Sequence, residues 1–184
     1  MICASIQSDM EKVHRVPLCY DLVEVWDERM VGMIDKPTIL KVVDEKKLSK
    51  NMQVDYIDFD IAMKMDKRAA DTRLIISYHE HEYTPPLQEL RSVIQTMQMQ
   101  NADICKVVTM AHTEQDNITL LRLLTETQFP LIAFCMGEKG RLSRIMAPHF
   151  GSLISYVPPT EEWKTADGQI VLSEWEKISK TLQI

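Results

Sequence analysis

Short apolar runs recur along the whole chain, and their spacing restricts the fold more than any other feature of the sequence. Eight runs are present, and successive runs start about 16 to 30 residues apart, the size of one strand followed by one helix. Several are nearly continuous in Val, Ile, Leu and Phe, which is typical of parallel strands covered on both faces. The runs are Ile2–Ile6, Asp21–Trp26, Thr38–Val43, Val54–Ile61, Leu74–Tyr78, Asp103–Val108, Pro130–Met136 and Ser152–Val157.

The segments between the later runs are long enough for helices, whereas those in the first half are short. Residues 87–100 and 116–128 carry apolar side chains at helical spacing, and a Thr-x-x-Asp start signal at 113–116 precedes the second segment. The Ser-x-x-Glu segment 173–176 has the pattern of a capping box that opens a last helix. These patterns predict an α/β protein, a compact (β/α)8 TIM barrel with short or missing helices in the first half. A doubly wound open sheet is the alternative, because such barrels typically need about 200 residues or more and this chain has 184.

No linker or shift in composition divides the chain, so we expect residues 1–184 to form one domain. The net charge of −6 argues against a nucleic-acid partner. No apolar window is long enough to span a membrane, and residues 1–12 lack the positive flank and apolar length of a signal peptide. The four cysteines have no metal-binding spacing, which favours reduced thiols in a cytoplasmic protein; they are Cys3, Cys19, Cys105 and Cys135.

Two histidines and two glutamates follow the fifth run, in the stretch "YHEHEYTPP" that begins at Tyr78. Residues two apart in a strand face the same side, so His79 and His81 could bind one metal ion. A metal site needs further ligands, and no other histidine falls at the end of a predicted strand. The other interpretation is that His79 faces the site as an acid and base while His81 and Glu82 lie on the following loop.

Lys106 lies in the middle of the sixth run, one strand after His79. Lysine is rarely buried without a function, and loss of solvation lowers the pKa of its amine. A neutral amine can attack a ketone and form a Schiff base. Because the sites of parallel barrels lie at the carboxyl ends of the strands, we expect Lys106 and His79 to act together. The alternative is a lysine that reaches solvent from a strand end.

Four motifs occur in the order found in type I 3-dehydroquinate dehydratases: "IISYHEHEYTPP", "NADICKVV", "PLIAFCMGEKGRLSRIMAPHFGS" and "ADGQI". The interval from His79 to Lys106 also equals that of the family, and the chain resembles it from Leu74 to Ile184. The resemblance implies a cytoplasmic, homodimeric enzyme of the shikimate pathway that dehydrates 3-dehydroquinate to 3-dehydroshikimate without metal or diffusible cofactor. Lys106 would form the imine with the substrate ketone. His79 would remove the proton beside the iminium carbon and return it to the departing hydroxyl.

The resemblance further implies which residues surround the substrate. Arg144 corresponds to the arginine that binds the substrate carboxylate, where a planar guanidinium forms two hydrogen bonds. The carboxylate that normally orients the histidine has no clear counterpart, and Glu24 and Asp60 are the candidates to orient His79. The remaining substrate-binding positions are Ser5, Glu24, Phe134, Met136, Tyr156 in place of a phenylalanine, and the lid residues Thr165 and Gln169.

The first half of the chain departs from the family pattern. Trp26 and Val43 stand where the family has arginines on the second and third strands, and Lys41 and Lys47 lie near the second of these positions. The arginines that are replaced here would recognise the substrate, whereas Lys106 would form the Schiff base. A related Schiff-base barrel acting on another keto acid is therefore one alternative, and a non-catalytic barrel is another.

Overall fold

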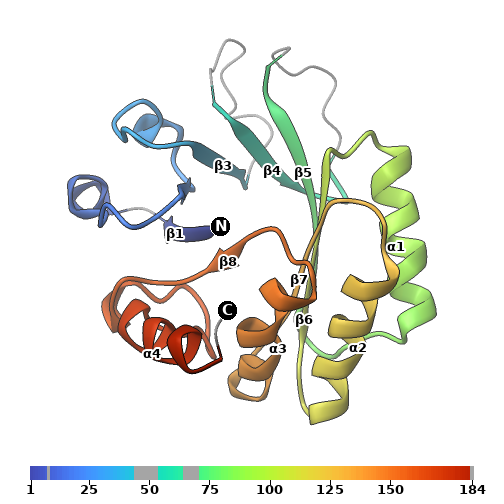
Figure 1. Ribbon diagram of the computed structural model, residues 1–184. Helices are drawn as coiled ribbons and strands as arrows, with labels where there is room; N and C mark the ends of the chain where they lie inside the picture. The colour runs from blue at the N-terminus through green and yellow to red at the C-terminus, as the bar shows by residue number, and fades with distance from the viewer. Residues whose placement is uncertain (8, 44–53, 64–70, 183–184) are drawn as a thin grey trace.

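The computed structural model describes residues 1–7, 9–43, 54–63 and 71–182. Eight parallel strands lie in one sheet, in the order β7-β6-β5-β4-β3-β2-β1-β8, and the sheet curls into a nearly closed barrel (Figure 1). Where the two ends of this order approach each other, the Leu153 N–H donates to the Leu131 carbonyl across 3.0 Å. The barrel prediction is confirmed, and the open doubly wound sheet is wrong. The strands are β1 (Ile2–Ile6), β2 (Leu22–Val25), β3 (Thr38–Val42), β4 (Tyr56–Asp60), β5 (Arg73–Glu80), β6 (Ile104–Met110), β7 (Leu131–Met136) and β8 (Ser155–Tyr156).

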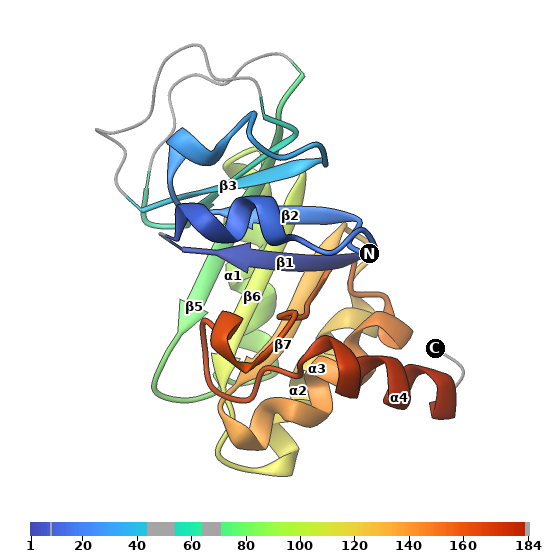
Figure 2. The same cartoon turned by 90° about the vertical axis from the view of Figure 1, so that its left-hand side faces the viewer.

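Within the described residues, the α-helices belong to the second half of the barrel, as the sequence predicts. Helix α1 (Leu87–Met99) follows β5, α2 (Glu114–Glu126) follows β6, α3 (Arg141–Met146) follows β7 and α4 (Leu172–Leu182) follows β8. Figure 2 shows these helices gathered around β5, β6 and β7, away from β1 to β3. In their described residues, the connections between β1, β2 and β3 contain the 3-10 turns η1 (Met10–Arg15) and η2 (Glu28–Met30) and no α-helix. Three further 3-10 turns in the second half are η4 (Glu138–Gly140), η5 (Ala147–Phe150) and η6 (Glu161–Trp163).

The two predicted helix starts have different outcomes. At the start of α2, the Asp116 carboxylate accepts hydrogen bonds from the backbone N–H groups of His112 (2.9 Å) and Thr113 (2.7 Å), as the start signal predicts. The capping box at 173–176 is wrong, because α4 begins at Leu172 and includes both of its residues. The carbonyl of Val171, one residue before the helix, accepts the Trp175 N–H at 2.9 Å. The helical hydrogen bonds therefore begin before the predicted cap at residue 173.

Side chains alternate between the inside and the outside of the barrel along each strand. The outward residues pack against the helices and turns and form the larger apolar cluster. The inward residues at the start of the strands fill the bottom of the barrel with an apolar layer of Cys3, Leu22, Ile39, Ile75, Ile104, Ile132 and Ile154. The next inward residue lies two positions later on each strand, and from β1 to β6 this residue is polar. These six residues, called the polar layer below, are Ser5, Glu24, Lys41, Asp58, Ser77 and Lys106.

Candidate active site

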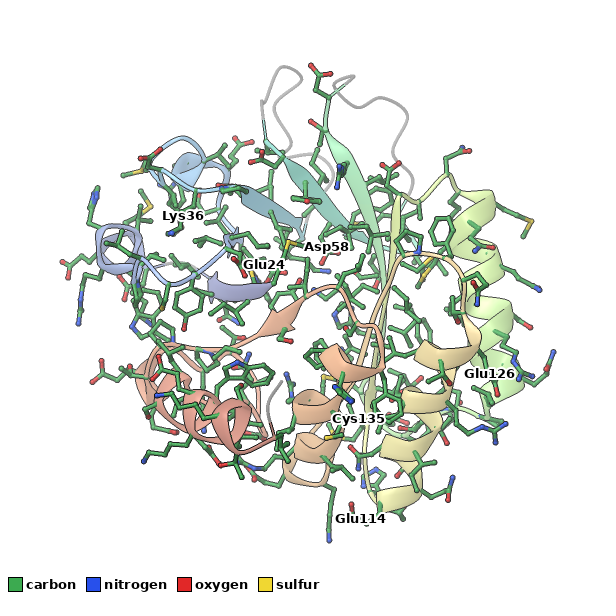
Figure 3. All side chains as sticks on the ribbon, viewed as in Figure 1. Glu24, Lys36, Asp58, Glu114, Glu126 and Cys135 are labelled. Carbon is green, nitrogen blue, oxygen red and sulfur yellow. The ribbon has the colours of Figure 1, made fainter. Side chains whose placement is uncertain are left out.

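Lys106 lies at the centre of the polar layer, on β6, with only 5% of its surface exposed. Its Nζ donates to Asp58 Oδ2 at 2.8 Å, to the Tyr156 hydroxyl at 3.0 Å and to Glu24 Oε1 at 3.2 Å. Figure 3 shows Glu24 and Asp58 inside the barrel, on the side formed by the early strands. The three donor positions of the ammonium are thereby occupied, so Lys106 is a paired cation and does not reach solvent.

The expected lowering of the Lys106 pKa is wrong. Burial by itself lowers this pKa, but the negative charges of Asp58 and Glu24 outweigh burial and raise the pKa well above its ordinary value. The sequence expectation included only the loss of solvation. The two acids that raise the pKa, Asp58 and Glu24, lie on β4 and β2, which are distant from Lys106 in the sequence. Lys106 therefore rests as an ammonium and must lose a proton before it can act as a nucleophile.

Asp58 connects Lys106 to a second buried lysine. Lys41 Nζ donates to Asp58 Oδ1 at 2.9 Å and to the Ser77 hydroxyl at 2.7 Å, and its side chain is 11% exposed. Burial of Asp58 raises its pKa, but the cations of Lys106 and Lys41 outweigh burial, so the pKa of Asp58 is lowered. Sequence reasoning missed Asp58 as a site residue. The signal that could have found it is its inward position in "YIDFD", two residues after Tyr56.

Glu24 is held from its other side by two donors. Its Oε2 accepts a hydrogen bond from Ser5 Oγ at 2.7 Å and one from the indole N–H of Trp26 at 3.1 Å. Trp26 therefore fills the predicted arginine position with a neutral donor. At the other lost arginine position, Val43 is more than half exposed after the end of β3. Lys47, the other lysine considered near that position, lies outside the described residues.

A pocket of about 150 Å³ opens above Lys106 at the carboxyl ends of the strands. It brings together most of the residues that the sequence predicts for the site. Ser5 does not line the pocket and acts through Glu24. The lining residues are Glu24, Trp26, His79, His81, Lys106, Val108, Phe134, Met136, Arg144, Tyr156, Thr165, Ala166 and Gln169.

His79 lies near the end of β5 and faces this pocket. Burial, the largest cause, and the nearby cations of Lys106 and Lys41 together lower its pKa from 6.5 to about 3. The sequence interpretation, in which this imidazole titrates near neutral pH, is therefore wrong. His79 rests as a neutral base. This state is the one that can accept a proton from a substrate or from Lys106.

Neither predicted carboxylate orients His79. Glu24 is occupied by Ser5, Trp26 and Lys106, and Asp60 accepts the backbone N–H of Ala62 at 2.9 Å. No described residue forms a hydrogen bond with the His79 ring. The His81 ring instead stacks near it, with ring centres 6.1 Å apart and planes inclined by 15°.

His81 and Glu82 follow the end of β5, as expected, and both are exposed. His81 nevertheless lines the pocket, which the expectation of a purely solvent-facing loop residue missed. Within the described part of the chain, no group of three or more His, Cys, Asp or Glu side chains is arranged to hold a metal ion.

Arg144 also lines the pocket. It lies on α3, is 8% exposed, and its guanidinium carbon is 4.5 Å from the centre of the Phe134 ring. Its Nε is buried without a hydrogen-bond partner, and no acidic side chain of the described residues pairs with it. Burial lowers its pKa to about 10, so Arg144 stays charged at neutral pH. A buried, unpaired guanidinium is suited to bind an anionic group of a ligand.

The loop after β8 covers the pocket from the side of β7. Gln169 Oε1 accepts the backbone N–H groups of Thr165 (2.6 Å) and Ala166 (3.2 Å), which fixes the loop as a turn. Gly168 has φ +75°, and a Cβ built on it would lie 2.1 Å from the Gly137 carbonyl oxygen. Only glycine allows this approach of the two loops. The fold and this site together define a TIM-barrel protein with a buried amine, an imidazole and a free guanidinium around one pocket.

Comparison with known proteins places this barrel in a family. The family model for Type I 3-dehydroquinase matches residues 5–184. A 3-dehydroquinate dehydratase from Pyrococcus abyssi is 37% identical over 177 residues, covering 88% of this chain and 80% of that protein. One from Methanococcus maripaludis (strain C6) is 27% identical over 186 residues, covering 95% of this chain and 81% of that protein.

Solved structures show the same fold at lower identity. The 3-dehydroquinate dehydratase from Geobacillus kaustophilus superposes with a TM-score of 0.77 at 21% identity, covering 99% of this chain and 90% of that one. The enzyme from Aquifex aeolicus gives 0.76 at 21% identity, covering 98% of each chain. The chain belongs to the type I 3-dehydroquinase family.

Proposed function

We propose that this protein dehydrates 3-dehydroquinate to 3-dehydroshikimate in the shikimate pathway, through a Schiff base on Lys106. One arrangement carries the proposal: the buried amine of Lys106 lies in the floor of a pocket whose walls present the neutral base His79 and the unpaired cation Arg144. Family membership of residues 5–184 supports the same reaction. The proposal treats residues 1–184 as one catalytic barrel.

Imine formation begins with proton loss from the Lys106 ammonium, and neutral His79 is the base in the pocket that can accept this proton. The amine lone pair then forms a C–N bond to the ketone carbon, and the carbonyl π electrons move to oxygen. The oxygen leaves as water after protonation, and a positively charged iminium remains. The iminium stays paired with Asp58 and Glu24, which already hold a cation at this position.

Elimination uses the same two residues. The iminium makes the neighbouring C–H acidic, and His79 takes that proton to give an enamine. The enamine electrons expel the hydroxyl on the next carbon, and His79 returns a proton so that it departs as water. A second water then hydrolyses the imine and releases the product with Lys106 free. The net change is the loss of one water molecule from the substrate.

An unbalanced positive charge in the pocket favours binding of an anionic substrate. In the empty site, Glu24 and Asp58 are balanced by Lys41 and Lys106, which leaves the Arg144 cation unbalanced. The carboxylate of 3-dehydroquinate supplies the missing anion, with two charge-assisted hydrogen bonds. Thr165 and Gln169 then cover the pocket from the lid, and Phe134, Met136 and Tyr156 surround the imine.

A related keto acid is the second candidate substrate. Neutral Trp26 occupies the position of an arginine that would recognise the substrate, and its indole N–H donates to Glu24 instead. Turnover of 3-dehydroquinate, followed by the absorbance of its conjugated product, should exceed that of simpler keto acids lacking the ring hydroxyls. Equal or faster reaction of another keto acid would favour the second candidate.

The proposal is tested by reducing the imine with borohydride in the presence of 3-dehydroquinate. Peptide mass spectrometry should find the adduct on Lys106. Lys106→Arg is the matched control, because it keeps a cation beside Asp58 and Glu24 but cannot form the imine. An adduct on another lysine, or full turnover by Lys106→Arg, contradicts the proposal, and the absence of any adduct or turnover in the wild type favours a non-catalytic barrel.

The same proposal includes a homodimer in the cytoplasm. The dimer rests on the family resemblance and is checked by light scattering of the purified protein. Three of the four cysteines, Cys3, Cys105 and Cys135, are buried and free, which supports a reducing compartment. Within the described residues, no helix is long and apolar enough to cross a membrane.

A further inference from the structure

Lys41 is a buried cation that the proposed reaction does not yet use. It lies on β3, directly beside Asp58 on β4 in the register of the sheet. It belongs to a continuous chain of hydrogen bonds from Ser5 through Glu24, Lys106 and Asp58 to Lys41, which then donates to Ser77. It does not line the pocket, so it acts on the substrate only through other residues.

Asp58 is fully buried and divides its two oxygens between two ammonium groups. Oδ1 accepts from Lys41 at 2.9 Å and Oδ2 accepts from Lys106 at 2.8 Å. If Lys106 loses its proton, the Asp58 carboxylate still has the Lys41 cation as a partner. Without Lys41, the same step would leave Asp58 as a buried carboxylate without an ion pair, which is strongly unfavourable in a protein interior.

We propose that Lys41 is a positioning residue that holds Asp58 ionised and makes proton release from Lys106 easier. This inference rests on the proposed Schiff-base function of Lys106. The Lys41 cation repels the Lys106 ammonium and takes over the shared carboxylate when the proton moves to His79. The released lone pair is then free to attack the ketone carbon.

Several other groups act on Lys106, and the effect of Lys41 must be separated from theirs. The acids Glu24 and Asp58 and the Tyr156 hydroxyl stabilise the ammonium, while burial opposes it. A variant at position 41 leaves all of these groups in place and changes only the second partner of Asp58. Among the described residues, the titratable and charged groups around Lys106 are Cys3 on β1, Glu24 on β2, Lys41 on β3, Asp58 on β4, His79 on β5, Tyr156 on β8 and Arg144 on α3.

The first test measures the free amine of Lys106 without any substrate. Acetic anhydride reacts only with neutral amines, so the acetylation rate of Lys106, followed by peptide mass spectrometry, reports how readily the ammonium loses its proton. The exposed Lys139 gives the reference rate in each sample. Lys41→Met should slow acetylation of Lys106 about tenfold at a fixed pH, because removal of a neighbouring charge shifts a pKa by about one unit or more. Lys41→Arg should restore the rate to within about twofold.

Lys36→Met is the matched control for loss of a lysine with two hydrogen bonds. Lys36 lies two residues before β3 and donates to the carbonyls of Leu18 and Tyr20. Figure 3 shows it apart from Glu24 and Asp58, the two carboxylates that pair with Lys106. This variant should leave the acetylation of Lys106 unchanged. Local unfolding in Lys41→Met would expose Lys106 and speed its acetylation, the opposite direction. An unchanged or faster rate in Lys41→Met therefore overturns the inference.

The second test uses turnover of 3-dehydroquinate over a range of pH. In Lys41→Met, kcat/KM should fall about tenfold at neutral pH and recover when the pH is raised by about one unit. A loss that is the same at every pH indicates a structural role and overturns the inference. Because acetylation needs no substrate, it tests the role of Lys41 even if borohydride trapping fails, so the two proposals fail separately.

Discussion

Charge pairing around single residues decides which side chains of the barrel are available to a substrate. Glu24 and Asp58 are fully occupied by Lys41 and Lys106. Arg144 is the buried cation without an acidic partner in the described chain. An unpaired buried charge lowers the stability of the empty protein, and a bound anion removes that cost. The site is therefore prepared for an anionic ligand.

Arg144→Met should weaken substrate binding without weakening the fold. The methionine keeps an apolar stem against Phe134 but cannot bind the carboxylate, so we expect KM to rise about tenfold or more. The melting temperature of the empty protein should stay constant or rise, since an unpaired buried charge is removed. Steady-state kinetics and thermal unfolding check both parts. An unchanged KM would mean that Arg144 only packs against Phe134.

His79 and His81 stack at the pocket, and the proposed reaction assigns the proton transfers to His79. We expect His79→Gln to lower kcat by about 10² to 10⁴, the usual contribution of a positioned acid and base. His81→Gln, the matched control on the adjacent loop, should change kcat by less than about threefold. Comparable losses in the two variants would show that the stacked pair acts as a unit.

At the scale of elements, the loops after β7 and β8 meet above the pocket through two glycines. Gly168 and Gly137 both have positive φ. The backbone of Gly137 lies where a Cβ on residue 168 would be. The lid residues Thr165 and Gln169 lie on the same turn as Gly168. The position of the lid over the pocket therefore depends on a backbone contact that only glycine permits.

Gly168→Ala should displace the lid, because its Cβ would lie 2.1 Å from the Gly137 oxygen. Gly151→Ala is the matched control: its φ is also positive, at +101°, but a Cβ there would meet nothing within 4 Å. Both variants carry the backbone strain of about 1 to 2 kcal/mol. Only Gly168→Ala should also raise KM, by several-fold, in steady-state assays with 3-dehydroquinate. Equal KM values in the two variants would show that the position of the lid does not affect substrate binding.

At the scale of the whole molecule, the buried ionisable groups connect the stability of the barrel to pH. The pKa of His79 is about 3 in the folded protein and about 6.5 in an unfolded chain. Between these values the unfolded chain binds one proton more than the folded protein. The stability contributed by neutral His79 is therefore present above pH 6.5 and is lost as the pH falls toward 3. Asp58, whose pKa is also lowered, adds a loss at the acidic end of this range.

Urea unfolding at several pH values between 6.5 and 4 should show the free energy of unfolding decreasing as the pH falls, with His79 contributing up to about 1.4 kcal/mol per pH unit. In His79→Gln the slope should be smaller, because glutamine does not titrate. His14→Gln, a change of an exposed histidine on η1, should keep the wild-type slope. If His79→Gln and wild type have parallel profiles, burial of neutral His79 does not control the acid stability.

Much of the fold and part of the site follow from local sequence. The eight apolar runs predict eight parallel strands because a continuous apolar strand must be covered on both faces. Helical spacing predicts α1 to within one residue and α2 to within two residues at each end. The family motifs predict Lys106, His79 and Arg144 as site residues, and all three line one pocket. These features depend on neighbours in the chain, which the sequence displays directly.

The protonation states and the polar layer were decided only by the tertiary structure. Lys106 has a raised pKa because Asp58 and Glu24 reach it from β4 and β2. His79 has a lowered pKa because the closed barrel buries it and places Lys106 and Lys41 nearby. The partnership of Lys41 with Asp58 likewise requires the register of β3 against β4. The charge of a buried group depends on distances to residues remote in sequence, and these distances exist only once the sheet has closed around them.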